Sequence, residues 1–176
     1  DNVTEYALAL ASKMGLSLDT QRSLRVAALL HDVGKLGVPD HILRKPANLT
    51  EAEFEAIKNH VTLGELIIQG IPNQEEVLSA VSTHHERWDG KGYPRGLGGN
   101  DIPLLGRILG VTDAYSAMTT DRPYRKALSA EDAKAELKRV SGTQLDPKIV
   151  DIFLETLEDE EAREESRVAV FASGRF

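Results

Sequence analysis

Residues 84–94 read His-His-Glu-Arg-Trp-Asp-Gly-Lys-Gly-Tyr-Pro, so two adjacent imidazoles run directly into a glycine-containing loop. Neighbouring side chains on a helix point about 100° apart, so His84 and His85 can share one metal ion only where the backbone turns. The glycines that follow permit such a turn and a close approach of the backbone to a ligand. Tyr93 adds a flat aromatic face, and Pro94 stiffens the end of the loop. The stretch therefore predicts a metal site beside a ligand-binding loop.

The composition limits the kind of protein to which this loop can belong. The chain has 176 residues, of which 41% are hydrophobic and 28% charged, and this suits one globular, cytoplasmic domain without membrane contact. Because cysteine is absent, a metal must be held by nitrogen and oxygen atoms, which favours iron, manganese, nickel or zinc. The net charge of -7 argues against binding long nucleic acid, although local basic patches can hold a small anion.

Apolar spacing predicts helices in the first third of the chain. Residues 3–14 keep a 3.6-residue rhythm from the outset, so we expect the first helix to begin before the first residue. Asp19 is expected to cap a second helix, which delivers His31 and Asp32 before Gly34 breaks it. The chain begins with aspartate and shows no signal-peptide pattern, so we expect it to be a fragment of a longer protein.

A long helix is predicted to follow in the middle of the chain. Thr50 and Glu53 match a capping box, and the helix is expected to end by Gly70. Phe54 and His60 lie on or near its apolar stripe, and His60 is therefore expected to face inward.

The remaining pattern also indicates helices. One helix after Pro72 leads to His84, and another begins near Pro103 and carries an aspartate among apolar residues. Ser129 is expected to cap a further helix, and Pro147 to begin one that enters an acidic segment. The last ten residues fit a short strand, a helix extension or a tail docked on the core.

Several of these helices carry metal-capable side chains on otherwise apolar faces, namely His31, Asp32, His60, His84, His85 and Asp113. Each residue alone is more often a hydrogen-bonded core group than a ligand, because buried polar groups are normally satisfied. Taken together, the six residues favour metal ligands over hydrogen-bonded core groups. Four imidazoles and two carboxylates exceed what one octahedral ion needs, but they suit two ions that share a carboxylate. Asp32 is the candidate bridge.

Taken in this order, the residues resemble the HD-GYP domain, a branch of the HD phosphohydrolase superfamily. Residues 31–35 resemble the HD signature, His60 the following ligand helix, and residues 84–94 the HHExxDGxGYP signature. Asp113 and residues 121–125 resemble the closing ligand helix and its phosphate-contacting extension. The resemblance covers nearly the whole chain. We therefore expect residues 1–176 to form one N-terminally truncated HD-GYP catalytic domain, with about ten C-terminal residues as a tail or helix extension.

The resemblance implies an all-α fold, a compact multi-helix bundle with the metal site in its helical core. It also implies hydrolysis of cyclic di-GMP, a bacterial second messenger, to linear pGpG and onward to GMP. Two or three divalent transition-metal ions are expected, most readily iron or manganese. One ion would take His60, His84 and His85 with bridging Asp32, and the other would take His31, Asp32 and Asp113. The family pattern places another histidine just upstream of this sequence.

Further roles follow from the resemblance. Asp32 and Lys35 are expected to be catalytic, and the substrate is expected to contact Lys35, Gly92, Tyr93, Arg122 and Arg125. A guanidinium matches phosphate oxygens in charge and geometry, but each arginine also fits a solvated turn. Tyr93 fits a guanine-stacking role and, equally, a packing anchor for the loop. Glu86 and Asp89 are expected to shape the loop rather than act as acids or bases.

Other functions stay open at this point. The domain fits a cyclic di-GMP effector module with little turnover, or a phosphodiesterase that prefers cyclic GMP-AMP. Cleavage of monomeric nucleotides is a third reading, against which the intact GYP loop speaks. A fused sensor or receiver domain is expected in the full-length protein, and a homodimer is compatible with the sequence.

Overall fold

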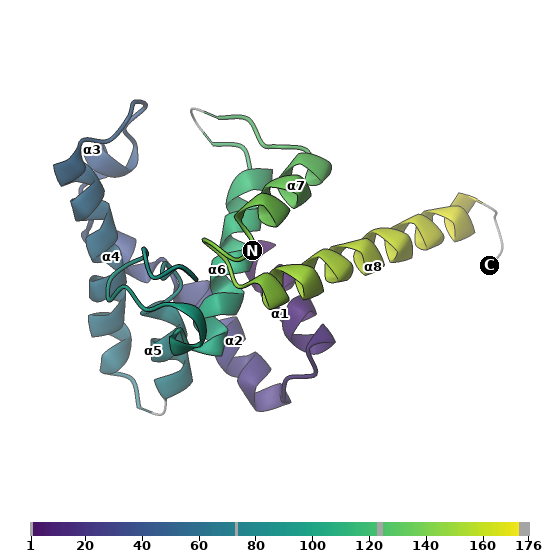
Figure 1. Ribbon diagram of the computed structural model, residues 1–176, viewed down its shortest axis with the longest axis horizontal. Helices are drawn as coiled ribbons and strands as arrows, with labels where there is room; N and C mark the ends of the chain where they lie inside the picture. The colour runs from purple at the N-terminus through teal and green to yellow at the C-terminus, as the bar shows by residue number, and fades with distance from the viewer. Residues whose placement is uncertain (1, 73, 123–124, 173–176) are drawn as a thin grey trace.

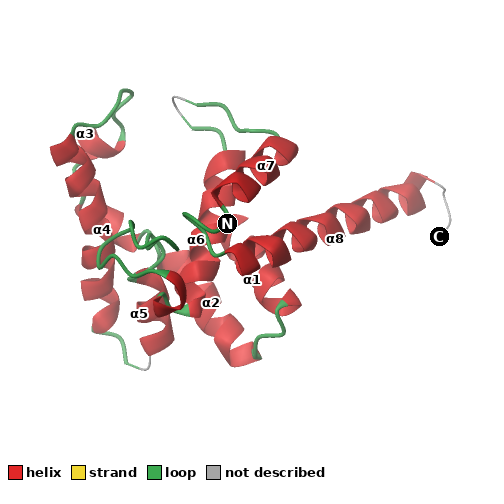
Figure 2. Ribbon diagram, viewed as in Figure 1, coloured by secondary structure: helices red, strands yellow, loops and turns green. Residues whose placement is uncertain are grey.

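The computed structural model describes residues 2–72, 74–122 and 125–172, and these residues form helices and loops without a β-strand (Figure 2). The helices are α1 (Asn2–Lys13), α2 (Leu18–Leu30), the 3-10 helix η1 (Val33–Gly37), α3 (Asp40–Leu43), α4 (Glu51–Gln69), α5 (Glu75–Val81), the 3-10 helix η2 (Gly99–Asp101), α6 (Leu104–Thr119), α7 (Ala130–Val140) and α8 (Pro147–Ala172). The predicted all-α fold is confirmed.

Helix α6 lies at the centre of the bundle (Figure 1). It packs against α1, α5, α7 and α8, while α2 packs against α1 and α5. Its buried side chains include Leu105, Ile108, Leu109, Val111 and Tyr115. A helix with apolar residues on more than one face is stable only when neighbours cover those faces, so this composition fixes α6 in the interior.

Three aromatic rings join the ends of α1, α6 and α8. The ring centroids of Tyr6 and Tyr115 lie 5.1 Å apart, and Phe153 lies 5.9 and 5.3 Å from them, all in edge-to-face geometry. Such pairs add to the free energy gained by burying their area. Phe153 is fully buried, so this cluster anchors α8 to the core.

Two glycines on α6 let the turn after α5 approach closely. A Cβ atom at Gly106 would lie 2.0 Å from the Thr83 hydroxyl oxygen, and one at Gly110 would lie 3.2 Å from the carbonyl oxygen of His84. The absence of side chains here brings His84 against α6. Asp113 follows Gly110 by three residues, so it lies on the same side of α6 as this contact.

A third glycine brings the HD pair against α4. A Cβ atom at Gly34 would lie 1.8 Å from the carbonyl oxygen of His60 and 2.6 Å from the amide nitrogen of Gly64. The 3-10 helix η1 therefore rests directly on the backbone of α4. Gly34 does not break the preceding helix as expected, because α2 already ends at Leu30 and η1 begins at Val33.

Most helix starts agree with the sequence, and one differs. The capping box of Thr50 and Glu53 is present, and the Ser129 hydroxyl accepts the Asp132 amide hydrogen bond at 3.1 Å. The second helix, in contrast, is capped by Ser17, whose hydroxyl accepts from the amide of Thr20. The prediction of Asp19 as the cap was wrong, since Asp19 lies inside the first turn and pairs with a nearby arginine there.

Helix α8 extends well beyond the body of the bundle (Figure 1). Its first part buries Ile149, Val150, Phe153 and Leu157, whereas residues 158–169 are exposed. Of the three predictions for the C-terminal residues, helix extension holds as far as Ala172, and Val168 is 58% exposed rather than docked. Residues 173–176 lie outside the described part. No helix among the described residues is long and apolar enough to cross a membrane.

Candidate functional site

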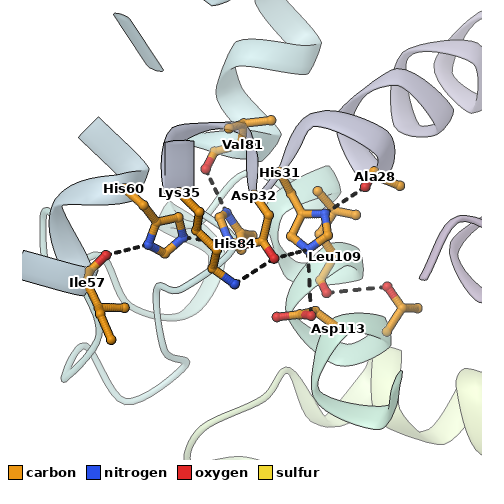
Figure 3. A network of polar contacts seen from close by, with 11 residues as sticks. Ala28, His31, Asp32, Lys35, Ile57, His60, Val81, His84, Leu109 and Asp113 are labelled. Atoms are coloured by element: carbon orange, nitrogen blue, oxygen red, sulfur yellow. Dashed lines mark hydrogen bonds and ion pairs between the residues drawn. The ribbon is translucent and has the colours of Figure 1, made fainter. Parts of the chain in front are cut away.

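Three of the predicted ligands are oriented by their own helical turns. Nδ1 of His31, His60 and His84 lies 2.6, 2.6 and 2.7 Å from the carbonyl oxygen of the residue three positions earlier (Figure 3). A carbonyl oxygen can only accept, so Nδ1 carries the proton in each ring. Nε2 is thereby left with a lone pair, and this is the usual way in which proteins prepare histidine as a metal ligand.

Four side chains converge at one point. Asp32, His60, His84 and His85 each direct a ligand atom to within 4.8 Å of the others. The ring centroids of His84 and His85 are 4.0 Å apart, because α5 ends at Val81 and the backbone turns before these residues. Within the described part of the chain, Nε2 of His60 and of His84 is buried without a hydrogen-bond partner. Buried acceptors of this kind are costly, so this donor set fits a divalent metal ion.

The Asp32 carboxylate lies between this group and His31. Its Oδ1 is 3.6 Å from Nε2 of His60, and its Oδ2 is 3.6 Å from Nε2 of His31. Nε2 of His31 also lies 3.7 Å from Oδ1 of Asp113 (Figure 3). His31, Asp32 and Asp113 thus form a second group of donors that shares one carboxylate with the first.

Burial keeps the first group of imidazoles neutral. It lowers the pKa of His60, lowers that of His84 well below the ordinary value, and lowers that of His85 to about 4, since each ring loses solvation of its charged form. Neutral imidazole is the form that binds metal ions. The metal-free protein therefore presents these ligands ready for a cation near neutral pH.

The second group has opposite electrostatics. Burial opposes the charged form of His31, but the contact with Asp113 and the charges of Asp113 and Asp32 raise its pKa. Burial likewise opposes the carboxylate of Asp113, yet contact with His31 lowers the pKa of Asp113 strongly. The two carboxylates therefore favour a positive charge beside Nε2 of His31, as a bound cation would supply.

The predicted catalytic lysine lies at the same carboxylate. Nζ of Lys35 is 2.6 Å from Oδ2 of Asp32 (Figure 3). The two residues are three positions apart at the start of η1, and each is partly exposed. Lys35 therefore places a partly exposed positive charge beside the predicted metal ligands.

One buried carboxylate fixes the position of the loop after His85. Glu86 accepts hydrogen bonds from the backbone amides of Arg95 at 2.8 Å and Leu97 at 3.0 Å. Asp89 accepts from the Arg87 guanidinium and from the Lys91 amide. Both carboxylates thus have the loop-shaping contacts expected from the sequence.

Gly92 and Tyr93 fold back onto the histidines. A Cβ atom at Gly92 would lie 2.4 Å from the Arg87 amide nitrogen and 2.6 Å from the His85 carbonyl oxygen, so only glycine fits there. The Tyr93 ring stacks on the His85 ring with a centroid distance of 5.0 Å and an interplanar angle of 28°. Burial raises the pKa of Tyr93 to about 12, which keeps its hydroxyl protonated.

A pocket of about 430 Å³ opens beside the cluster. His84, His85, Asp113, Gly92 and Tyr93 line it on the metal side. This size is within the range of small-molecule sites. Three of the predicted metal ligands and the predicted loop therefore line one cavity.

The two predicted phosphate-binding arginines lie elsewhere. Arg122 and Arg125 are exposed on the segment after α6, and neither lines the pocket. Their backbones pair with each other, and the Arg125 guanidinium donates a hydrogen bond to the Ala117 carbonyl oxygen of α6. Pro123 and Tyr124 lie outside the described residues.

Two pocket residues were missed by the sequence analysis. Phe54 and Lys58 also line the pocket. Phe54 was predicted on or near the apolar stripe of its helix, but its side chain is 46% exposed and lines the pocket. The four-residue spacing of Phe54 and Lys58, which puts both side chains on one face of the helix that carries His60, was the available signal.

Removing the Glu86 carboxylate is expected to loosen this loop. Glu86→Gln keeps the shape of the side chain, but its NH2 group replaces one of the two oxygens that accept backbone hydrogen bonds. Glu86→Ala leaves both backbone amides without their acceptor. We expect losses of about 1 and about 3 kcal/mol in the free energy of unfolding, respectively. Urea unfolding measures both. Equal stability of Glu86→Ala and the unmodified protein would contradict the role of this carboxylate, and Glu164→Ala on exposed α8 is the control.

Comparison with known proteins identifies the family. Residues 1–149 match the family model described as HD domain. The chain therefore belongs to the HD domain family, and its recognition from sequence as an HD-GYP member is confirmed.

Individual relatives agree with this assignment. A Thermotoga maritima protein named cyclic di-GMP phosphodiesterase is 44% identical over 147 residues, which cover 82% of this chain and 40% of that protein. The 3'3'-cGAMP-specific phosphodiesterase 1 of Vibrio cholerae is 38% identical, with 86% of this chain and 36% of that protein covered. The chain thus spans less than half the length of these relatives.

A solved structure shows the same fold. The HDG"Y"P protein from Bdellovibrio bacteriovorus superposes with a TM-score of 0.73 at 21% identity, over 89% of this chain and 50% of that chain.

Proposed function

We propose that this domain is a metal-dependent phosphodiesterase that hydrolyses cyclic di-GMP to linear pGpG and then to GMP. One observation carries the proposal: preoriented imidazoles and shared carboxylates meet at the wall of a pocket that also contains the GYP loop. The names of the relatives support the same substrate class. Because those relatives are longer, the fused regulatory domain, the homodimer and the cytoplasmic setting remain predictions from the sequence.

The ligands are proposed to hold two divalent ions, iron or manganese, and a third ion is compatible with the family pattern. His60, His84, His85 and Asp32 would hold one ion, and His31, Asp32 and Asp113 the other. Such ions lower the pKa of bound water and offset the charge of a phosphate and of the leaving alkoxide. The contact geometry of Asp32, with one oxygen toward each group, supports a bridging role.

The chain itself supplies binding and orientation. Lys35 is proposed to exchange its contact with Asp32 for a phosphate oxygen, since an ammonium binds either anion. Gly92 allows the loop backbone to approach the substrate, and Tyr93 holds the His85 ring in place by stacking. Arg122 and Arg125 are proposed to contact parts of the substrate that extend beyond the pocket.

Turnover tests the proposal. The protein is loaded with iron(II) or manganese(II) without oxygen and incubated with cyclic di-GMP, and the products are separated by chromatography. We expect linear pGpG from the loaded protein and none after treatment with EDTA. Tight binding without product would instead identify an effector module.

Substrate choice needs a second measurement, because relatives of both specificities are similar to this chain. Cyclic di-GMP and 3'3'-cGAMP are offered together in equal amounts. We expect faster loss of cyclic di-GMP, and the opposite order would assign the domain to the cGAMP-specific group.

A further inference from the structure

Two residues in the wall of the pocket have no role at the predicted metal ligands. Phe54 and Lys58 lie one turn apart on α4 and line the pocket that His84, His85 and Asp113 also line. Tyr93 from the GYP loop completes this wall. The wall thus joins the long helix to the loop that touches the metal ligands.

The three side chains contact one another. The rings of Phe54 and Tyr93 are 6.4 Å apart at an interplanar angle of 82°. Nζ of Lys58 lies 5.4 Å from the centre of the Phe54 ring and 5.6 Å from that of Tyr93. The ammonium therefore lies within cation–π range of both aromatic rings.

The wall is also open to a ligand. A phenylalanine that is 46% exposed gains little from the hydrophobic core, so core packing does not account for Phe54. Lys58 also pairs with Glu55, but that contact joins neighbours on a helix surface, and Glu55 is exposed. Exposed pairs of this type contribute little, so the ammonium is free to exchange partners.

We propose that Phe54 and Lys58 form a guanine-binding subsite, in which Phe54 stacks on one base and the Lys58 ammonium donates hydrogen bonds to its O6 and N7. Aromatic side chains stack on any base, whereas a lysine that donates to O6 and N7 distinguishes guanine. Adenine presents an amino donor at the equivalent position, which repels the ammonium. This subsite rests on the proposed function, since it assigns the base specificity of the same pocket.

The ring of Tyr93 lies between the proposed subsite and the predicted metal ligands. Tyr93 contacts Phe54 on one side and stacks on His85 on the other. A base held at Phe54 would therefore be separated from the ligand His85 by the ring of Tyr93. Lys58 is two residues from His60 on α4, so one rigid helix positions both the base contact and the metal contact.

Binding measurements test the subsite without turnover. A phosphorothioate analogue of cyclic di-GMP is titrated by calorimetry into manganese-loaded protein. We expect Phe54→Leu to weaken binding about tenfold, through the loss of stacking. Lys58→Met is expected to reduce the preference for the guanine analogue over the matching cyclic di-AMP analogue by about tenfold. Leu66→Ala, on the exposed face of the same helix, is the control and should bind as the unmodified protein does.

A substrate without a base separates the subsite from the chemistry. Bis(4-nitrophenyl) phosphate needs the metal cluster but has no purine, so its metal-dependent hydrolysis should be the same in both variants and in the unmodified protein. If the variants bind the analogue unchanged, or lose hydrolysis of both substrates equally, the subsite is excluded.

The two proposals fail in different ways. Weaker binding by the variants, with no hydrolysis of either substrate by the unmodified protein, would support the subsite and overturn the phosphodiesterase. Hydrolysis of cyclic di-GMP with unchanged binding by the variants would do the reverse. An unmodified protein that neither binds nor hydrolyses the dinucleotide would overturn both.

Discussion

Replacing Asp32 with alanine is expected to abolish metal binding and hydrolysis of cyclic di-GMP together. Asp32 is the one carboxylate whose two oxygens face both groups of donors, at 3.6 Å from His60 and 3.6 Å from His31. Its removal takes one ligand from each proposed ion and removes a negative charge that favours cation binding. We expect metal content near zero and activity lower by at least about 10²–10³-fold.

The measurement is metal content per protein, followed by turnover of the same sample. Asp32 is partly exposed and is not part of the apolar core, so the variant should fold and keep its helical circular dichroism. Asp19→Ala, which removes an exposed carboxylate paired only with a neighbouring arginine, is the control. Full metal content in Asp32→Ala would show that the carboxylate does not bridge.

Gly34→Ala is expected to give the largest loss of stability from a single methyl group. The added carbon would lie 1.8 Å from the His60 carbonyl oxygen and 2.6 Å from the Gly64 amide nitrogen, both backbone atoms of α4. Neither can rotate away, so η1 must separate from α4. Overpacking of this kind costs about 3 kcal/mol or more, and a chain of this length should lose roughly 10 °C in melting temperature.

The same 3-10 helix supplies a matched control. A Cβ atom at Gly37 would meet only the tip of the Leu63 side chain, at 2.5 Å, and that side chain can change its rotamer. Gly37→Ala should therefore change the free energy of unfolding by less than about 1 kcal/mol. Thermal unfolding and metal affinity are measured for both variants. Since His60 moves with α4, Gly34→Ala should also weaken metal binding, and similar effects at the two glycines would refute the backbone contact.

The sequence predicted the helices and the metal-capable residues well because both depend on local patterns. The capping residues Thr50 and Ser129 fix helix starts through contacts within one turn. The paired histidines at residues 84 and 85 follow directly from the end of α5. Periodicity alone also placed His60 on a buried face, and it is buried.

What the sequence could not predict depends on contacts between distant segments. Phe54 fits the apolar stripe of α4, but its ring lies against the distant loop residue Tyr93 and lines the pocket. The choice of Ser17 over Asp19 as a cap depends on the exact first turn of α2, where both residues are suitable. The contact of Gly34 with α4 appears only when residues 34 and 60 meet in three dimensions.

Three of the histidines are oriented by hydrogen bonds within their own segments, and this affects how the site can evolve. Each of His31, His60 and His84 is held by a carbonyl three residues earlier in its own segment, so each ring has an orienting contact that does not come from another ligand. Loss of one ligand by mutation should therefore leave the remaining ones in place. A lineage can exchange one coordinating residue, and with it the preferred cation, while the other ligands and the helical scaffold stay as they are.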